Sequence, residues 1–238
     1  MKVKKIKEIE DKIKEISLSH LSIPSTPCGD QFVFILGKDK VEFKDWKRKE
    51  VRESENKKLI IILESPHKDE YKNEAEPEPA KGKTGENIAN FLNIVLKTLP
   101  SDEYDVILMN AIQYQCSMGV PTNFFRTLSF VALWFDGGKE DFEARLRKLK
   151  LTKYDVVINA CTVGGGSYTK TLYGSNLNQG FLQEKFSNKK IVFKSATLKE
   201  LVNEVVKKVR SENKFSYYTT THPSSWKDET TINLNESV

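Results

Sequence analysis

The sequence predicts a single α/β domain over residues 1–238, a three-layer α/β/α sandwich with a central, mainly parallel sheet of four strands. Four short runs rich in β-branched or aromatic residues lack polar alternation, as strands buried on both faces of a parallel sheet do. These runs are residues 59–63, 106–109, 156–158 and 215–220. Segments with apolar residues at helical spacing separate most of them: residues 86–99, 123–135, 139–149 and 198–209.

The first segment, residues 1–22, is predicted to be an amphipathic helix. Ile6, Ile9, Ile13 and Ile16 recur every three or four positions, with Lys and Glu between them. The charged residues interrupt the apolar ones, so the segment lacks the continuous apolar core of a secretory signal. We expect this helix to pack on the domain.

The remaining segments complete the predicted domain. Residues 32–36 and 41–43 are predicted to form a hairpin. The proline-containing, charged stretch 65–83 is predicted to be a long loop after the first parallel strand. Residues 191–193 form a candidate further strand, and the polar tail 227–238 is expected to be frayed.

Composition excludes several classes of protein. The 238 residues carry 38 Lys and Arg against 33 Asp and Glu, a net charge of +5 that does not by itself indicate a polyanion partner. Apolar runs such as residues 59–63 are far shorter than the roughly 20 residues that span a bilayer. The three cysteines form no CxxC pair, which excludes a four-thiolate metal site within one chain. We therefore expect a monomeric, cytoplasmic protein without metal or cofactor.

Polar residues follow each of the four predicted parallel strands. Ligands of open α/β sheets bind outside the carboxyl ends of the strands. Four stretches occupy these positions: residues 64–70, 110–113, 159–166 and 221–226. Two of the three histidines, His67 and His222, lie in this set. A carboxylate, an amide and an imidazole are thus predicted to meet at one edge of the sheet.

Three of these motifs resemble the uracil-DNA glycosylase superfamily. The motifs are residues 60–66 (Ile-Ile-Ile-Leu-Glu-Ser-Pro), residues 106–110 (Val-Ile-Leu-Met-Asn) and His222-Pro223-Ser224. In that superfamily the first motif holds the attacking water, an Asn closing a later strand reads the base, and a His-Pro-Ser loop supports the leaving group. The resemblance spans roughly residues 58 to 226, with the motifs in the family's order.

The resemblance implies roles for individual residues. The implied catalytic residues are Glu64, Glu70, Asn110 and His222. The implied substrate contacts are Ser65, Pro66, His67, Asp69 and Ser224. The implied DNA contacts are Lys81, Lys83, Thr84 and Gly85 at the start of a helix, and Trp226 as a wedge that enters the duplex.

The sequence departs from the family pattern at the first motif. Ser65 precedes Pro66 where the uracil-specific branch has its water-activating Asp. Glu64 and Glu70 instead match the Glu-x-Pro-x-x-x-Glu pattern of the iron–sulfur branch, whose cysteine ligands are missing here. His67 stands where the uracil-specific branch has a Tyr that excludes substituents at C5 of the pyrimidine. A narrow choice of uracil therefore does not follow from the resemblance.

The residue types suit cleavage of an N-glycosidic bond. The reaction places positive charge on the sugar and negative charge on the departing base. A carboxylate such as Glu64 stabilises the first charge and positions water, and a donor such as His222 stabilises the second. The amide of Asn110 offers both a donor and an acceptor, so it suits uracil or cytosine.

Each motif also has an ordinary structural interpretation. Asn110 could cap a turn, His222 could end a strand, and Trp226 could pack over the edge of the sheet. The glycines at 164–166 could hold a phosphate or form a tight turn. A Walker A loop ending at Lys83 and Thr84 is excluded, because Pro77 stands where that motif needs Gly.

The sequence therefore predicts a monofunctional DNA glycosylase that flips a pyrimidine out of DNA and leaves an abasic site. The expected substrate is a cytosine enlarged at C5, such as the hydroxymethylated or glucosylated cytosines of some phage DNAs, with a role in antiviral defence. The side chain of Tyr71 or Phe91 could instead exclude substituents at C5, as the Tyr of the uracil-specific branch does. Plain uracil repair, a non-catalytic modified-base binding module and a nucleoside or nucleotide hydrolase are the alternatives.

Overall fold

The protein has a mixed α/β fold built on one sheet of seven strands. The computed structural model describes residues 26–37, 41–52, 55–73, 76–97, 99, 103–116, 130, 133–163 and 197–237. The strands are β1 (Gln31–Leu36), β2 (Lys49–Glu50), β3 (Lys58–Leu63), β4 (Tyr104–Asn110), β5 (Val156–Asn159), β6 (Ser216–Thr219) and β7 (Asn235–Glu236). The helices are α2 (Lys83–Leu96), α4 (Lys139–Lys148), α7 (Leu198–Asn213) and α8 (Glu229–Ile232).

The centre of the sheet is parallel and its edges are antiparallel. The strand order is β2-β1-β4-β3-β5-β6-β7, with parallel pairing from β4 through β3 and β5 to β6. The four predicted parallel strands are these four. The prediction of a four-stranded sheet was wrong, because β2 and β1 extend one edge and β7 the other by antiparallel pairing.

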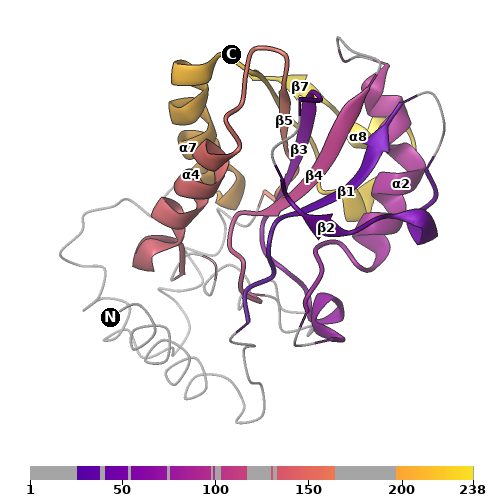
Figure 1. Cartoon of the computed structure of the whole chain (residues 1–238), viewed down its shortest axis with the longest axis horizontal. Helices are drawn as coiled ribbons and strands as arrows, with labels where there is room; N and C mark the ends of the chain where they lie inside the picture. Colours follow the sequence, from indigo (N-terminus) through magenta and orange to yellow (C-terminus); the bar gives the residue numbers. More distant parts are fainter. Residues whose placement is uncertain are drawn as a thin grey trace, which may run out of the picture.

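Apolar side chains from both faces of the central strands form the core. Ile60 and Ile62 of β3 pack on the side of α4 and α7, whereas Leu59, Ile61 and Leu63 pack on the side of α2 and α8. Figure 1 shows these two helix pairs on opposite sides of the sheet. Burial on both faces explains the unbroken apolar sequence of β3.

Two predicted elements need correction. The predicted hairpin is absent from the described residues, because β1 pairs with β2 and β4, and Phe43–Asp45 form a 3-10 turn. The tail predicted to be frayed is ordered up to residue 237: Asp228 caps α8, Ile232 is buried, and β7 pairs with β6.

Other predicted segments lie outside the described residues. These are the helix predicted for 1–22, the strand predicted for 191–193 and most of the helix predicted for 123–135. The predicted helices at 139–149 and 198–209 correspond to α4 and α7. Across the ranges that the structure covers, no helix has the length and apolar character needed to cross a membrane.

Helix α2 begins at Lys83, three residues earlier than predicted, and its first turn packs tightly. A Cβ atom built on Gly85 would collide with the carbonyl oxygen of Ala80 and the ring of Phe43. Gly82, the residue before the helix, has its nearest such neighbour at 3.8 Å, which is an ordinary contact. Gly85 therefore serves the packing of α2.

We expect Gly85→Ala to destabilise the protein by about 3 kcal/mol or more, since backbone must move to admit the methyl group. Gly82→Ala is the control and is expected to cost about 1 kcal/mol or less. Chemical denaturation of both variants measures the difference. Equal stabilities of the two variants would show that the first turn of α2 can accommodate a methyl group at position 85, contrary to the structure.

Candidate active site

The strand order places a topological switch point at the end of β3. The chain passes from β3 to β4 on one side, and later to β5 on the other side of β3. Connections that diverge from one strand leave a crevice at its carboxyl end, where ligands of such folds bind. Glu64 follows β3 and Asn110 ends β4, so two predicted catalytic residues lie at this point.

Asn110 is buried, and its side-chain oxygen has no hydrogen-bond partner. The residue is 1% exposed. Its Nδ2 donates to Sγ of Cys28 at 3.7 Å, whereas Oδ1 has no partner among the described residues. Buried polar atoms in native proteins are almost always paired, so this oxygen at the switch point is an acceptor available to a ligand or a water molecule.

Ser65 carries a second buried oxygen of this kind. Its Oγ is buried and has no partner within the part of the chain that the structure describes. Ser65 lies in the bend that directly follows β3, two residues beyond Leu63, which is in register with Asn110. The two unpaired oxygens therefore belong to the carboxyl ends of neighbouring parallel strands.

Glu64 leaves the sheet on the opposite face. It is 5% exposed, and its Oε2 accepts hydrogen bonds from Thr162 N at 2.9 Å and from Thr162 Oγ1. Its charge acts on Cys161 and on Lys199 of α7. Glu64 and Asn110 therefore do not converge on one face, and a ligand that reaches both must lie beyond the strand ends.

Lys199 is the cation on the Glu64 side. Its Nζ donates to the carbonyl oxygen of Thr220. Burial lowers the pKa of Lys199, and the nearby Cys161 and Glu64 act in the opposite direction.

Glu70, predicted to be catalytic, holds a loop together. Its Oε2 accepts from His67 N at 2.7 Å and its Oε1 accepts from Ala80 N at 2.6 Å. The residue is 6% exposed, and burial raises its pKa to about 7, although these backbone donors and Arg48 oppose the shift. Because both of its oxygens accept hydrogen bonds from the backbone, Glu70 has a structural role in this loop.

His67 and Asp69 form the start of the same loop. His67 Nδ1 accepts from Asp69 N at 3.4 Å and lies 3.3 Å from Asp69 Oδ2. Both side chains are partly exposed. Tyr71 is buried, and its hydroxyl donates to Gln113 O at 3.1 Å. Cys28 N donates to the same carbonyl oxygen at 2.7 Å, so the hydroxyl of Tyr71 and the backbone of Cys28 meet at Gln113.

The loop after β6 fixes the tautomer of His222. Its Nδ1 accepts from Ser224 N at 3.2 Å and lies 2.8 Å from Ser224 Oγ. A backbone N–H can only donate, so the neutral ring carries its proton on Nε2. Asn87 of α2 holds this loop, donating from Nδ2 to Pro223 O at 2.8 Å and to Trp226 O at 3.2 Å.

Trp226, predicted to be a wedge in DNA, is part of the core. Its indole is 1% exposed and packs with the apolar residues of α2 and α8. Its Nε1 donates to Thr221 O at 3.1 Å. A side chain that is held in the core cannot enter a duplex, so the structural interpretation replaces the functional one.

Of the four predicted phosphate contacts before and within α2, two are accessible to a ligand and two are engaged in contacts within the protein. Lys83 is exposed and Thr84 is half-buried. Lys81 forms an ion pair with Glu78, at 2.7 Å between Nζ and Oε2, and Gly85 is buried by packing. Lys83 is therefore the exposed cation of this group.

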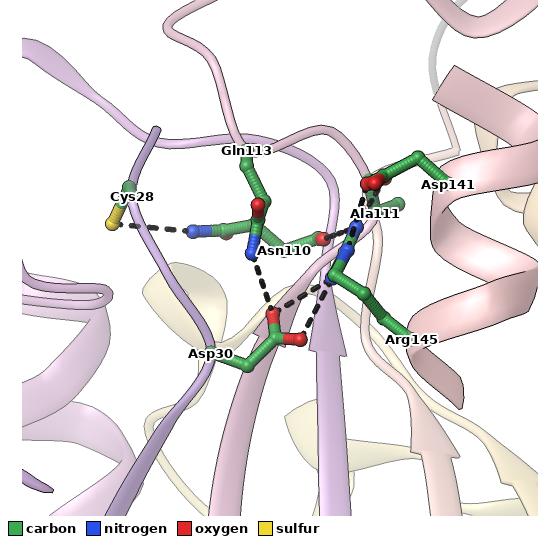
Figure 2. Close-up of polar contacts among 7 residues, drawn as sticks. All are labelled: Cys28, Asp30, Asn110, Ala111, Gln113, Asp141 and Arg145. Atoms are coloured by element: carbon green, nitrogen blue, oxygen red, sulfur yellow. Dashed lines mark hydrogen bonds and ion pairs between the residues drawn. The ribbon is translucent and has the colours of Figure 1, made fainter. Parts of the chain in front are cut away.

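A network around Asn110 was not predicted from the sequence. Arg145 of α4 donates to the carbonyl oxygens of Asn110 and Ala111 at 3.0 and 3.2 Å (Figure 2). The same guanidinium binds Asp30 at 2.7 and 2.9 Å. Asp30 precedes β1, and no motif or periodicity connects it with Arg145.

The sequence matches no protein-family model, and a search of curated proteins gave no match. Among the described residues, no group of three or more His, Cys, Asp and Glu side chains is placed to hold a metal ion. A proposal about function therefore rests on the geometry of the sheet edge and on the sequence motifs.

We expect Trp226→Ala to lower the free energy of unfolding by about 3–5 kcal/mol, since it leaves a large cavity in the core. Tyr154→Ala, which truncates an aromatic side chain that is 60% exposed, is the matched control and should change stability little. Thermal or chemical denaturation measures both. A Trp226→Ala variant as stable as the wild type would show that the indole is not part of the core.

Glu70 makes stability depend on pH with a defined sign. Its pKa is raised from 4.5 unfolded to about 7 folded, so the folded state binds the proton more tightly. Its contribution is complete below about pH 4.5 and is lost as the pH rises through 7. The stability of the wild type relative to Glu70→Gln should fall by on the order of 3 kcal/mol across this window. If the relative stability rose with pH instead, the hydrogen bonds from His67 N and Ala80 N would outweigh the effect of burial on the pKa of Glu70.

Proposed function

We propose that the protein is a monofunctional DNA glycosylase with a uracil-DNA glycosylase-like α/β/α sandwich. One observation carries the proposal: Asn110 is buried at the switch point of the sheet with its side-chain oxygen unpaired. A base flipped out of DNA presents N–H donors on its Watson–Crick edge, and Oδ1 of Asn110 is an acceptor for one of them. The ordered triple of motifs in the sequence supports the same assignment.

His222 and Glu64 serve the two charges of the reaction in this proposal. With its proton on Nε2, the neutral imidazole of His222 donates to the departing base. The carboxylate of Glu64 faces the sugar, where it stabilises positive charge and orients the attacking water. Ser65 supplies a second buried hydroxyl oxygen near the base. No step requires a metal or an organic cofactor.

Contacts with DNA come from the first turn of α2 and from the loop after β6. Lys83 is an exposed cation at the positive end of the helix dipole, which suits a phosphate group. Ser224 is exposed beside His222 and offers a hydroxyl group to the same strand. Such contacts fix the register of the protein on DNA without reading its sequence.

The proposed substrate is a pyrimidine enlarged at C5, with hydroxymethylated or glucosylated cytosine of phage DNA as the preferred case and antiviral defence as the role. His67 at the position after the motif proline favours it, because this half-exposed side chain leaves more room than a Tyr. The burial of Tyr71, whose hydroxyl shares the carbonyl oxygen of Gln113 with Cys28 N, favours the second candidate, uracil repair, since a ring on the Cys28 side of Asn110 would restrict a base there.

The test measures base release from DNAs that contain uracil, unmodified cytosine, hydroxymethylcytosine or glucosylated hydroxymethylcytosine. Alkaline cleavage detects the abasic site, and mass spectrometry identifies the released base. We expect release from the modified DNA, with and without EDTA. Rapid release of uracil with no action on modified DNA would select repair, and release from none would refute glycosylase activity on these bases.

Variants connect the activity to the site. Asn110→Ala and His222→Ala should each lower kcat by about 10²–10³-fold, as removal of a preorganised donor or acceptor does in other enzymes. Asn90→Ala, on the exposed surface of α2, is the matched control and should retain full activity. Melting temperatures of all three should stay close to that of the wild type. Full activity in Asn110→Ala would remove this residue from the site.

A further inference from the structure

Asn110 lies inside a closed ring of polar contacts that joins three distant segments. Its side chain contacts Cys28 through Nδ2, and its backbone oxygen accepts from Arg145. Arg145 binds Asp30, which is two residues after Cys28. The ring therefore fixes both the backbone and the side chain of Asn110 (Figure 2).

Arg145 uses every donor of its guanidinium. Nε donates to Asp141 at 2.8 Å, Nη1 donates to both oxygens of Asp30, and Nη2 donates to Asn110 O and Ala111 O. These five bonds match the five N–H groups that a guanidinium possesses. Lys has three donors on a single atom and cannot reproduce a planar fork of this kind.

Gln113 connects Asp30 with the backbone of Cys28. Its Oδ1 accepts from Gln113 Nε2 at 3.3 Å, and Gln113 O accepts from Cys28 N at 2.7 Å. The charged groups of Asp30 and Arg145 are largely withdrawn from solvent, with side chains 13% and 15% exposed. A desolvated ion pair contributes little net stability and is often retained because it fixes one geometry.

We propose that the Asp30–Arg145 ion pair is a positioning device for Asn110, which keeps Oδ1 directed toward the ligand while Nδ2 stays on Cys28. Arg145 and Asp30 touch no reacting atom; they act through Asn110. The effect on catalysis rests on the proposed glycosylase function, whereas the effect on the geometry of Asn110 does not.

The structure provides a matched control on the same helix. Arg147 of α4 pairs with Glu212 and Glu143 on the surface and has no contact with the sheet edge in the described part of the chain. Arg147→Lys thus makes the same substitution in an exposed ion pair. Arg145→Lys and Asp30→Asn each alter the buried pair and keep a polar side chain in place.

The first measurement is independent of any activity. Iodoacetamide alkylation of the folded protein, followed by peptide mass spectrometry, reports the exposure of Cys28, with buried Cys161 on the opposite face as the internal reference. We expect Arg145→Lys and Asp30→Asn to raise the rate at Cys28 by about tenfold through local opening, with Cys161 and Arg147→Lys unchanged. An unchanged rate at Cys28, or an equal rise at Cys161, would overturn the positioning role.

The second measurement uses base release. Arg145→Lys should lower kcat by about 10–100-fold, because small misplacements of a reacting group are costly. In the Asn110→Ala background the same change should cost nothing further, since the two residues act as one unit. Additive losses would overturn the proposal. Absence of base release by the wild type would refute the proposed function, and the alkylation rates would still decide whether the ion pair holds Cys28 in place against the side chain of Asn110.

Discussion

The parallel pairing of β3 with β4 on one side and β5 on the other is the constraint on which the rest depends. Leu63 is in register with Asn110, and Ile62 is in register with Asn159. This register brings the ends of three strands to one level, although their residues are far apart in the sequence. The burial of β3 on both faces requires a paired strand on each side and helices above and below it.

The same pairing divides the sheet edge into two halves. Strand alternation places Asn110 on the side of α2, whereas Glu64 bonds to Thr162 and lies near Cys161 and Lys199 on the side of α7. A substrate that lies across the end of β3 can bring its base to one half and its sugar to the other. In the proposed glycosylase reaction, the developing charges on the sugar and on the base would lie on these two faces of the sheet.

The central strands and the long helices could be predicted because their apolar residues follow the periods of strand and helix. The edge strands β2 and β7 could not, since two exposed polar residues carry no such period. The place of Asn110 at the sheet edge could be predicted from its position at the end of a strand, whereas Arg145 and Asp30 are 115 positions apart and share no motif. Trp226 and Glu70 have structural roles because their side chains are buried, and burial of this kind is visible only in the tertiary structure.

The most direct test of the account is a crystal structure of the protein with DNA that carries a cationic pyrrolidine in place of one nucleotide. This group mimics the charge that develops on the sugar, and it needs no knowledge of the base. The account predicts the pyrrolidine nitrogen beside the carboxylate of Glu64, with Asn110 and His222 around the space vacated by the base. DNA bound on another face, with Glu64 remote from that nitrogen, would contradict it.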